Sequence, residues 1–197
     1  MPSAVNGLYN RLGKVLIAND RIQAKVKELA LKIARDFHDE EVALIANLKG
    51  SFRFLSDLCS QIRIPVTIDF VSFNSYGGSD KSSGRIEVRK DLGVDVRDRN
   101  VILVEDIVDT GLTLDAVIDY LMRFKRPRSV KICALLDKVS SRVVDVPINY
   151  RGFVLPDKFV VGYGLDYAEY FRELNSIMEF KPPKSGRRGP AERRKRA

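Results

Sequence analysis

The chain lacks several residues and segments that would define a class of protein. Its 197 residues include no tryptophan, one histidine and two cysteines. One histidine and two cysteines cannot supply a Cys/His zinc site. The longest apolar runs fall short of the ~18 residues that a membrane span needs, and the N-terminal segment has no apolar signal-peptide core. We therefore expect a cytoplasmic protein without a membrane span, in which Cys59 and Cys133 are free core thiols rather than a disulfide.

The positive charge is concentrated at one end of the chain. The formal net charge is +8, but residues 181–197 hold eight Lys or Arg and one Glu, which leaves the remaining 180 residues near neutrality. The terminal segment has no side chain that could build a core, so we predict a disordered basic tail. The composition of residues 1–180 is that of one folded domain. Nucleic acid is thus an unlikely partner for the body, and contacts with it are expected only as nonspecific ones of the tail.

Hydrophobic periodicity predicts an α/β fold with a doubly wound, mainly parallel sheet flanked by helices. Helical spacing covers residues 20–38, 52–62 and 114–124, and strand patterns cover 42–46, 66–73, 85–89, 101–104 and 130–136. Residues 147–165 alternate short apolar runs with Pro and Gly, which favours small antiparallel strands outside the main sheet. We expect a core of about residues 20–146 and a hood made by the N-terminal segment and about residues 147–180.

The most informative segment is residues 101–113, VILVEDIVDTGLT. An apolar strand leads into Glu105 and Asp106, and a loop with Asp109 precedes a helical pattern. The turn would aim free backbone N–H groups at an anion, yet its carboxylates repel phosphate. A ribose phosphate suits both features, because its phosphate can bind the N–H groups and its hydroxyls can donate to the carboxylates. An acidic strand end beside an ordinary helix start is the alternative. The spacings of a P-loop and of a dinucleotide-binding glycine motif are both missing.

Other segments carry weaker signals. Lys49 and Gly50 link a strand to a helix start, where they could approach an anion or form an ordinary turn with a solvated lysine. Residues 74–84 form a Gly/Ser-rich loop that is either a surface excursion or a lid. Lys138 ends a strand and would face the ligand crevice of a parallel sheet, although most lysines are only solvated. Phe159 could stack on a base or belong to the core.

The order of these pieces resembles that of the hypoxanthine-guanine phosphoribosyltransferases, which have the type I phosphoribosyltransferase fold. The resemblance rests on LKGS, SYG, VEDIVDTGLT, LLDK and PDKFVVGYGLDYAEYFR, and it covers about residues 8–180. It implies purine salvage, in which 5-phosphoribosyl passes from 5-phosphoribosyl 1-pyrophosphate to N9 of hypoxanthine or guanine. The products would be IMP or GMP and pyrophosphate, with Mg²⁺ as cofactor. It also implies a homodimer or a homotetramer.

The resemblance assigns roles by position. Asp109 would be the catalytic base or acid at purine N7, and Glu105 and Asp106 would contact the ribose hydroxyls and the metal. The loop that would hold the 5′-phosphate consists of Asp109, Thr110, Gly111, Leu112 and Thr113, where Leu112 replaces the Lys of some relatives and only its N–H should matter.

The other subsites follow in the same way. Pyrophosphate would be bound by Lys49, Gly50 and Arg172, with a cis peptide bond falling at Leu48–Lys49. Ser75 and Tyr76 would belong to a closing lid. The purine would contact Lys138, Phe159 and Val160, and Asp166 would bind Mg²⁺.

Two other functions are open to a chain of this kind. A phosphoribosyltransferase-like RNA-binding regulator should carry basic residues on its folded body, whereas this body is nearly neutral. An adenine or orotate transferase is the second alternative. Adenine enzymes of this type have Ala at the position of Asp109, so Asp favours a 6-oxopurine. The sequence does not rank hypoxanthine, guanine and xanthine, since much of their recognition is through backbone.

Overall fold

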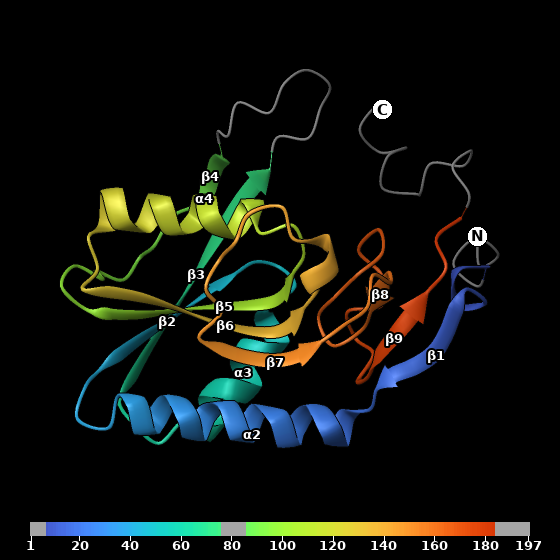
Figure 1. Cartoon of the computed structure of the whole chain (residues 1–197), viewed down its shortest axis with the longest axis horizontal. Coiled ribbons are helices and arrows are strands. Elements are labelled where there is room, and N and C mark those ends of the chain that lie inside the picture. The colour runs from blue at the N-terminus through green and yellow to red at the C-terminus, as the bar shows by residue number, and fades with distance from the viewer. Residues whose placement is uncertain (1–6, 76–85, 184–197) are drawn as a thin grey trace. The chain divides into compact units, whose positions relative to one another are not determined.

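The structure is a computed structural model that describes residues 7–75 and 86–183. The chain divides into two compact units, one of residues 23–157 and the other of residues 1–22 with 158–197. Figure 1 shows the helices and strands by label and colour. Within the described ranges, no helix combines the length and the apolar character that crossing a bilayer demands.

The larger unit is built on a six-stranded sheet in the order β4-β3-β2-β5-β6-β7. All neighbours pair in parallel except β3 and β4. The strands are β2 (Val42–Asn47), β3 (Val66–Ser75), β4 (Ile86–Lys90), β5 (Asn100–Val108), β6 (Ser129–Asp137) and β7 (Tyr150–Val154). This confirms the expected doubly wound, mainly parallel sheet.

Helices cover both faces of this sheet, with α4 on one face and α2 and α3 on the other (Figure 1). The helical elements are α2 (Asn19–Asp36), α3 (Phe52–Gln61), α4 (Leu112–Tyr120), the π-helical turn η1 (Leu121–Lys125) and the 3₁₀ turn η2 (Val139–Ser141). The face under α4 packs Leu114, Val117 and Leu121 against alternate residues of the central strands. The central strand β2 is buried at five successive positions, as expected for a parallel strand covered on both sides.

One expectation was wrong. Residues 150–154 do not lie outside the main sheet but form its edge strand β7, parallel to β6 with Tyr150 opposite Cys133. Without β7, the backbone of β6 would have an unpaired edge. Tyr150 anchors β7 further, because its ring is buried and its hydroxyl donates to Asp36 of α2 at 2.9 Å. The Pro residues that suggested isolated strands lie on either side of β7, and one Gly lies within it.

The smaller unit contains the antiparallel sheet that was expected outside the core. It has three strands in the order β1-β9-β8: β1 (Leu12–Ile17), β8 (Val160–Val161) and β9 (Ile177–Phe180). The buried residues Leu8, Val161, Phe171 and Phe180 form its own apolar core. In this sheet β1 pairs with β9 in antiparallel orientation.

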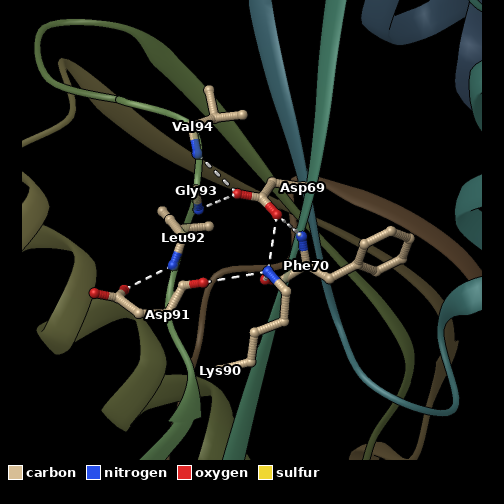
Figure 2. A network of polar contacts seen from close by, with 7 residues as sticks. All are labelled: Asp69, Phe70, Lys90, Asp91, Leu92, Gly93 and Val94. Carbon is tan, nitrogen blue, oxygen red and sulfur yellow. Dashed lines mark hydrogen bonds and ion pairs between the residues drawn. The ribbon is translucent and has the colours of Figure 1, made fainter.

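A carboxylate on β3 fixes the connection between β4 and β5. The side chain of Asp69 accepts hydrogen bonds from the backbone N–H groups of Phe70, Gly93 and Val94 at 2.6–2.9 Å, and from Lys90 Nζ at 3.0 Å (Figure 2). Burial opposes ionisation of Asp69, but these donors outweigh it and lower its pKa to about 2. Asp69 thus ties residues 90–94 to the sheet.

Candidate functional site

The topology places one loop of the larger unit where parallel sheets bind ligands. The chain runs from β2 outward to β3 and then returns to the other side of β2 as β5, so the order reverses between β2 and β5. Ligands of open α/β sheets bind at the carboxyl ends of strands at such a point. Residues 48–50 follow β2, and residues 105–113 end β5 and begin α4. Both predicted anion-binding segments therefore lie at this switch point.

The turn after β5 has the backbone form of an anion site. Gly111 precedes α4 with φ of +85°, in the left-handed region that favours glycine. The backbone N–H groups from Gly111 to Leu114 belong to the first turn of the helix and have no partner within it. The Thr110 hydroxyl is 3.4 Å from the Leu112 N–H. The start of α4 can therefore hold a phosphate through backbone donors and two threonine hydroxyls.

A neighbouring segment supports this turn from behind. The N–H groups of Val143 and Val144 donate to Thr110 O at 2.9 and 3.0 Å. A Cβ atom on Gly111 would lie only 2.5 Å from Val144 O, so the close approach requires glycine. The turn is thus packed against residues 143–144.

Two carboxylates enter the pocket before this turn. The pocket has a volume of about 200 Å³ and is lined by Asn47, Gly111, Leu114, Thr113 and residues 105–110. Glu105 is 6% exposed, and its pKa is raised well above the usual value by burial and then by the charge of Asp106, against a hydrogen bond with Asn47. Asp106 is partly exposed, and its Oδ1 accepts from the Ile107 N–H at 2.9 Å. The pocket therefore offers one buried acid that favours the neutral form and one more accessible acid.

The segment after β2 approaches these acids closely. The Leu48–Lys49 peptide bond is cis, as the resemblance implied. Gly50 faces Asp106, and a Cβ on residue 50 would lie 1.7 Å from Asp106 Oδ2. Lys49 is exposed. The structure thus brings the predicted pyrophosphate segment beside the predicted ribose acids.

Lys138 lies beside the turn of residues 109–113, the predicted phosphate turn, because β6 is in register with β5. Val108 is opposite Asp137, which makes Asp109 and Lys138 the next residues along, and the Lys138 N–H donates to Val108 O at 2.9 Å. The Lys138 side chain is only 9% exposed, and its Nζ lies 3.6 Å from Asp109 Oδ2 and 3.8 Å from Asp157 Oδ1. Lys138 is therefore a buried cationic donor held between two exposed carboxylates.

The predicted residues Phe159, Val160, Asp166 and Arg172 belong to the smaller unit. The Phe159 ring is 43% exposed and makes an edge contact with Tyr167 at 6.0 Å between ring centroids. Val160 is buried at the start of β8. The Phe159 ring thus packs on a neighbouring ring but remains accessible to solvent, whereas the ring of a core phenylalanine would be buried.

Asp166 and Arg172 contact each other within the same unit. Arg172 Nη2 lies 2.8 Å from Asp166 Oδ1, and Arg172 Nη1 donates to Gly164 O at 2.8 Å. The Glu169 N–H donates to Asp166 Oδ2 at 2.8 Å. Arg172, predicted to bind pyrophosphate, therefore orients Asp166, predicted to bind Mg²⁺. A metal ion on Asp166 would share the carboxylate oxygens with Arg172 and the Glu169 N–H.

The two predicted lid residues are described only in part. Ser75 is the last residue of β3, and its backbone pairs with Ile86 of β4. Tyr76 lies outside the described residues. The lid remains a prediction.

The donor groups suit a hard divalent cation. Mg²⁺ is usually bound by one or two carboxylates together with substrate phosphates and waters, rather than by a cage of protein ligands. Among the residues that the structure describes, no cluster of three His, Cys, Asp or Glu side chains forms such a cage. Glu105 and Asp106 do share the pocket, and beside them Asn47 Oδ1 is buried with no hydrogen-bond partner in the described chain. The residues present thus fit a cation that arrives with a phosphorylated ligand.

Sequence reasoning missed two contributors to this edge of the sheet. Asn47 bonds Glu105 and lines the pocket. The available signal was one polar residue at the end of the apolar run VALIAN. Arg142 pairs with the buried Asp137 next to Lys138. Nothing in the local sequence distinguishes Arg142 from a solvated arginine.

The chain is similar to known proteins over most of its length. The family model of the phosphoribosyl transferase domain matches residues 16–168. The chain is 44% identical to a hypoxanthine-guanine phosphoribosyltransferase of Bacillus subtilis over 86% of this chain and 93% of the relative. It is 42% identical to a hypoxanthine phosphoribosyltransferase of Salmonella typhimurium over 82% of this chain and 91% of the relative.

A solved structure is similar over the same range. The crystal structure of a hypoxanthine-guanine phosphoribosyltransferase from Bacillus anthracis, which holds a HEPES molecule in its active site, superposes with a TM-score of 0.83. It is 46% identical and covers 86% of this chain and 99% of its own.

Proposed function

The chain belongs to the phosphoribosyltransferase family, and from this premise we propose that it is a purine salvage enzyme acting on 6-oxopurines. It transfers 5-phosphoribosyl from 5-phosphoribosyl 1-pyrophosphate to N9 of hypoxanthine or guanine and releases pyrophosphate. The observation that carries this proposal is the buried Lys138 ammonium beside Asp109 and the phosphate turn. This arrangement offers a donor for a purine oxo group and a proton acceptor next to a ribose-phosphate site.

The sugar is held by the turn and the pocket acids. Backbone N–H groups and the hydroxyls of Thr110 and Thr113 bind the 5′-phosphate at the start of α4. Glu105 and Asp106 accept hydrogen bonds from the ribose hydroxyls. Lys49, Gly50 and Arg172 are assigned to the pyrophosphate. These contacts fix the anomeric carbon for attack, which is the main contribution that positioning makes to such a transfer.

The purine is bound by a donor, an acceptor and an aromatic face. Lys138 donates to the 6-oxo group, Phe159 stacks on the ring and the Val160 backbone bonds its edge. As the bond from C1′ to pyrophosphate breaks and the bond to N9 forms, the purine loses a proton, and Asp109 accepts it at N7. The Lys138 Nζ lies 3.6 Å from the Asp109 carboxylate, so the donor to the oxo group and the proton acceptor are neighbours.

Glu105 and Asp106, and Asp166 of the smaller unit, are the residues proposed to hold Mg²⁺, which would neutralise the charge that develops on pyrophosphate. Shielding from water remains the predicted role of Ser75 and Tyr76. A homodimer or homotetramer and a cytoplasmic location complete the proposal, and light scattering during gel filtration tests the oligomer.

Discrimination between purines tests the proposed function. Lys138 has donors and no acceptor, whereas adenine presents an amino donor at position 6. Adenine N1 is also an acceptor, where a 6-oxopurine carries an N1–H that can donate to a backbone carbonyl. Each unpaired buried polar group costs about 1–3 kcal/mol, and the two mismatches, at position 6 and at N1, give discrimination on the order of 10⁴. We therefore expect hypoxanthine and guanine to be substrates with Mg²⁺ and the pyrophosphorylated sugar, and adenine to be used about 10⁴-fold less well.

In the same assay, Lys138→Ala should raise the KM for hypoxanthine and guanine. It should also reduce the difference in kcat/KM between these bases and adenine. Comparable adenine use by the unmodified protein would overturn the 6-oxopurine assignment. The RNA-binding regulator predicts no turnover of any base together with salt-sensitive RNA binding.

A further inference from the structure

A buried ion pair lies directly behind the residues that the proposed reaction uses. Asp137, the last residue of β6, is 1% exposed and precedes Lys138 in the chain. Its carboxylate pairs with Arg142 through Oδ1 and with Arg151 through Oδ2, the latter at 2.8 Å. The two arginines differ in environment, because the Arg142 side chain is 14% exposed and that of Arg151, on β7, is 49% exposed. A buried carboxylate of this kind requires compensation by nearby cations.

Arg142 also touches the phosphate turn. Its Cδ lies 3.1 Å from the position of a Cβ on Gly111, so its aliphatic stem covers that residue. The two residues that follow, Val143 and Val144, donate their N–H groups to Thr110 O. Residues 142–144 therefore contact both Thr110 and Gly111, which are the residues that set the direction of the turn.

The position of this segment depends on the Asp137 pair. Arg142 Nε is buried and has no hydrogen-bond partner within the described residues, so the contact of its guanidinium with Asp137 is the interaction that orients it. The Leu155 N–H donates to Asp137 O at 2.9 Å, which fixes the backbone of Asp137 to the chain after β7. The carboxylate is thus a rigid anchor on the sheet, and Arg142 connects that anchor to the turn.

We propose that Arg142 is a positioning residue for the phosphate turn: anchored on Asp137, it holds residues 142–144 against Thr110 and Gly111 and so presets the N–H groups that bind the 5′-phosphate. The inference rests on the proposed function, since it concerns the same site. The Arg142 guanidinium itself need not touch the substrate. Its effect should therefore appear in binding of the phosphorylated ligand more than in turnover at saturation.

Arg151 supplies a matched control, because it pairs with the same carboxylate but does not contact the turn. For Arg142→Gln we expect the KM for the pyrophosphorylated sugar to rise by about 10-fold, with a smaller change in kcat, as follows from misplacing a binding group. For Arg151→Gln we expect both constants to stay within about 2-fold of the unmodified protein, because no binding group moves. Arg142→Lys, which keeps a cation near Asp137, should recover part of the lost affinity.

A structural role without positioning would produce a different pattern. It predicts that Arg142→Gln and Arg151→Gln both lower the melting temperature and change the sugar KM by the same factor. This result would overturn the proposal. Asp137→Asn provides a second test in protein that remains folded by circular dichroism. If Arg142 acts through Asp137, the double variant should have a sugar KM close to that of Asp137→Asn alone. A double-variant KM increase equal to the product of the two single increases would contradict the proposal.

Calorimetric titration with ribose 5-phosphate separates this inference from the proposed function. Absence of turnover in the unmodified protein would reject the proposed function. The positioning role would still be tested by ribose 5-phosphate, whose affinity should fall about 10-fold in Arg142→Gln and stay unchanged in Arg151→Gln. Equal affinities in the two variants, or no binding to the unmodified protein, would reject the role of Arg142.

Discussion

An oxygen of the Asp106 carboxylate lies 1.7 Å from the point that a Cβ on residue 50 would occupy, so Gly50 is the residue that allows Asp106 its place in the pocket. The contact is with the end of a side chain rather than with backbone. Gly50→Ala should therefore fold and displace Asp106. We expect the KM for the pyrophosphorylated sugar to rise by at least about 10-fold, because displacement of a positioned group by about 1 Å can reduce rates 10²-fold.

Gly7→Ala is the control for this prediction, since a Cβ on that exposed residue meets no atom within 4 Å. Steady-state kinetics and thermal melting of both variants are the measurements. Unchanged kinetics in Gly50→Ala would show that the Asp106 carboxylate is not needed where the structure has it.

Asp109 and Asp157 provide a matched pair around Lys138, at 3.6 and 3.8 Å from its Nζ. Only Asp109 is assigned to proton transfer. Asp109→Asn should lower kcat by roughly 10²–10⁴, the range of a lost general base, with less effect on sugar binding. Asp157→Asn should leave kcat near that of the unmodified protein. If the two variants lose turnover equally, the carboxylates act by supporting Lys138, and the role of Asp109 as base is wrong.

Asp69 should make stability depend on acid. Its pKa is about 2 in the folded chain and 3.8 is the usual value, so the folded state favours the ionised form. The stabilisation is complete above the unfolded value and is lost as the pH falls from about 4 to about 2. Asp69→Asn should therefore be less stable at pH 7, and its stability should fall less steeply over that acid window.

Urea unfolding of Asp69→Asn at a series of pH values measures this dependence. Asp145→Asn, which changes an exposed carboxylate, is the control. Parallel acid limbs for Asp69→Asn and the unmodified protein would exclude the network of Figure 2 as a source of the pH dependence.

The described part of the chain ends at Pro183, which gives a position for truncating the basic segment. The Lys181 N–H donates to Arg11 O at 3.1 Å, and Arg11 Nη1 donates to Lys181 O at 3.3 Å, so removal after Phe180 would break two hydrogen bonds next to the β1–β9 pair. Residues 184–197 carry seven Lys or Arg and one Glu. Truncation after Pro183 should leave the melting temperature and the purine kinetics unchanged and reduce salt-sensitive retention on heparin. A large loss of activity would assign the tail a role in the site.

The local pattern of the sequence was enough to identify most of the secondary structure and the turn between β5 and α4. Apolar runs such as Val42–Asn47 and Asn100–Val108 are buried on both faces of a parallel sheet, which leaves a continuous signal in the sequence. The turn of residues 109–113 needs glycine for its positive φ and small hydroxyl residues around it, and these requirements are also local. Strand β7 was misassigned because edge pairing depends on a partner distant in the chain.

Tertiary structure alone decided which residues support the site. The register of β5 with β6 sets Lys138 beside Asp109, and the reversal of strand order sets Gly50 against Asp106. Asn47, Asp137 and Arg142 acquire their roles from contacts with residues 5 to 58 positions away, such as that of Asn47 with Glu105 and that of Arg142 with Asp137. The sequence determined which chemical groups are available, because backbone conformation and residue type are local properties. Their burial, pairing and pKa were decided by the fold, because a charge is desolvated or compensated only by whatever the chain packs around it.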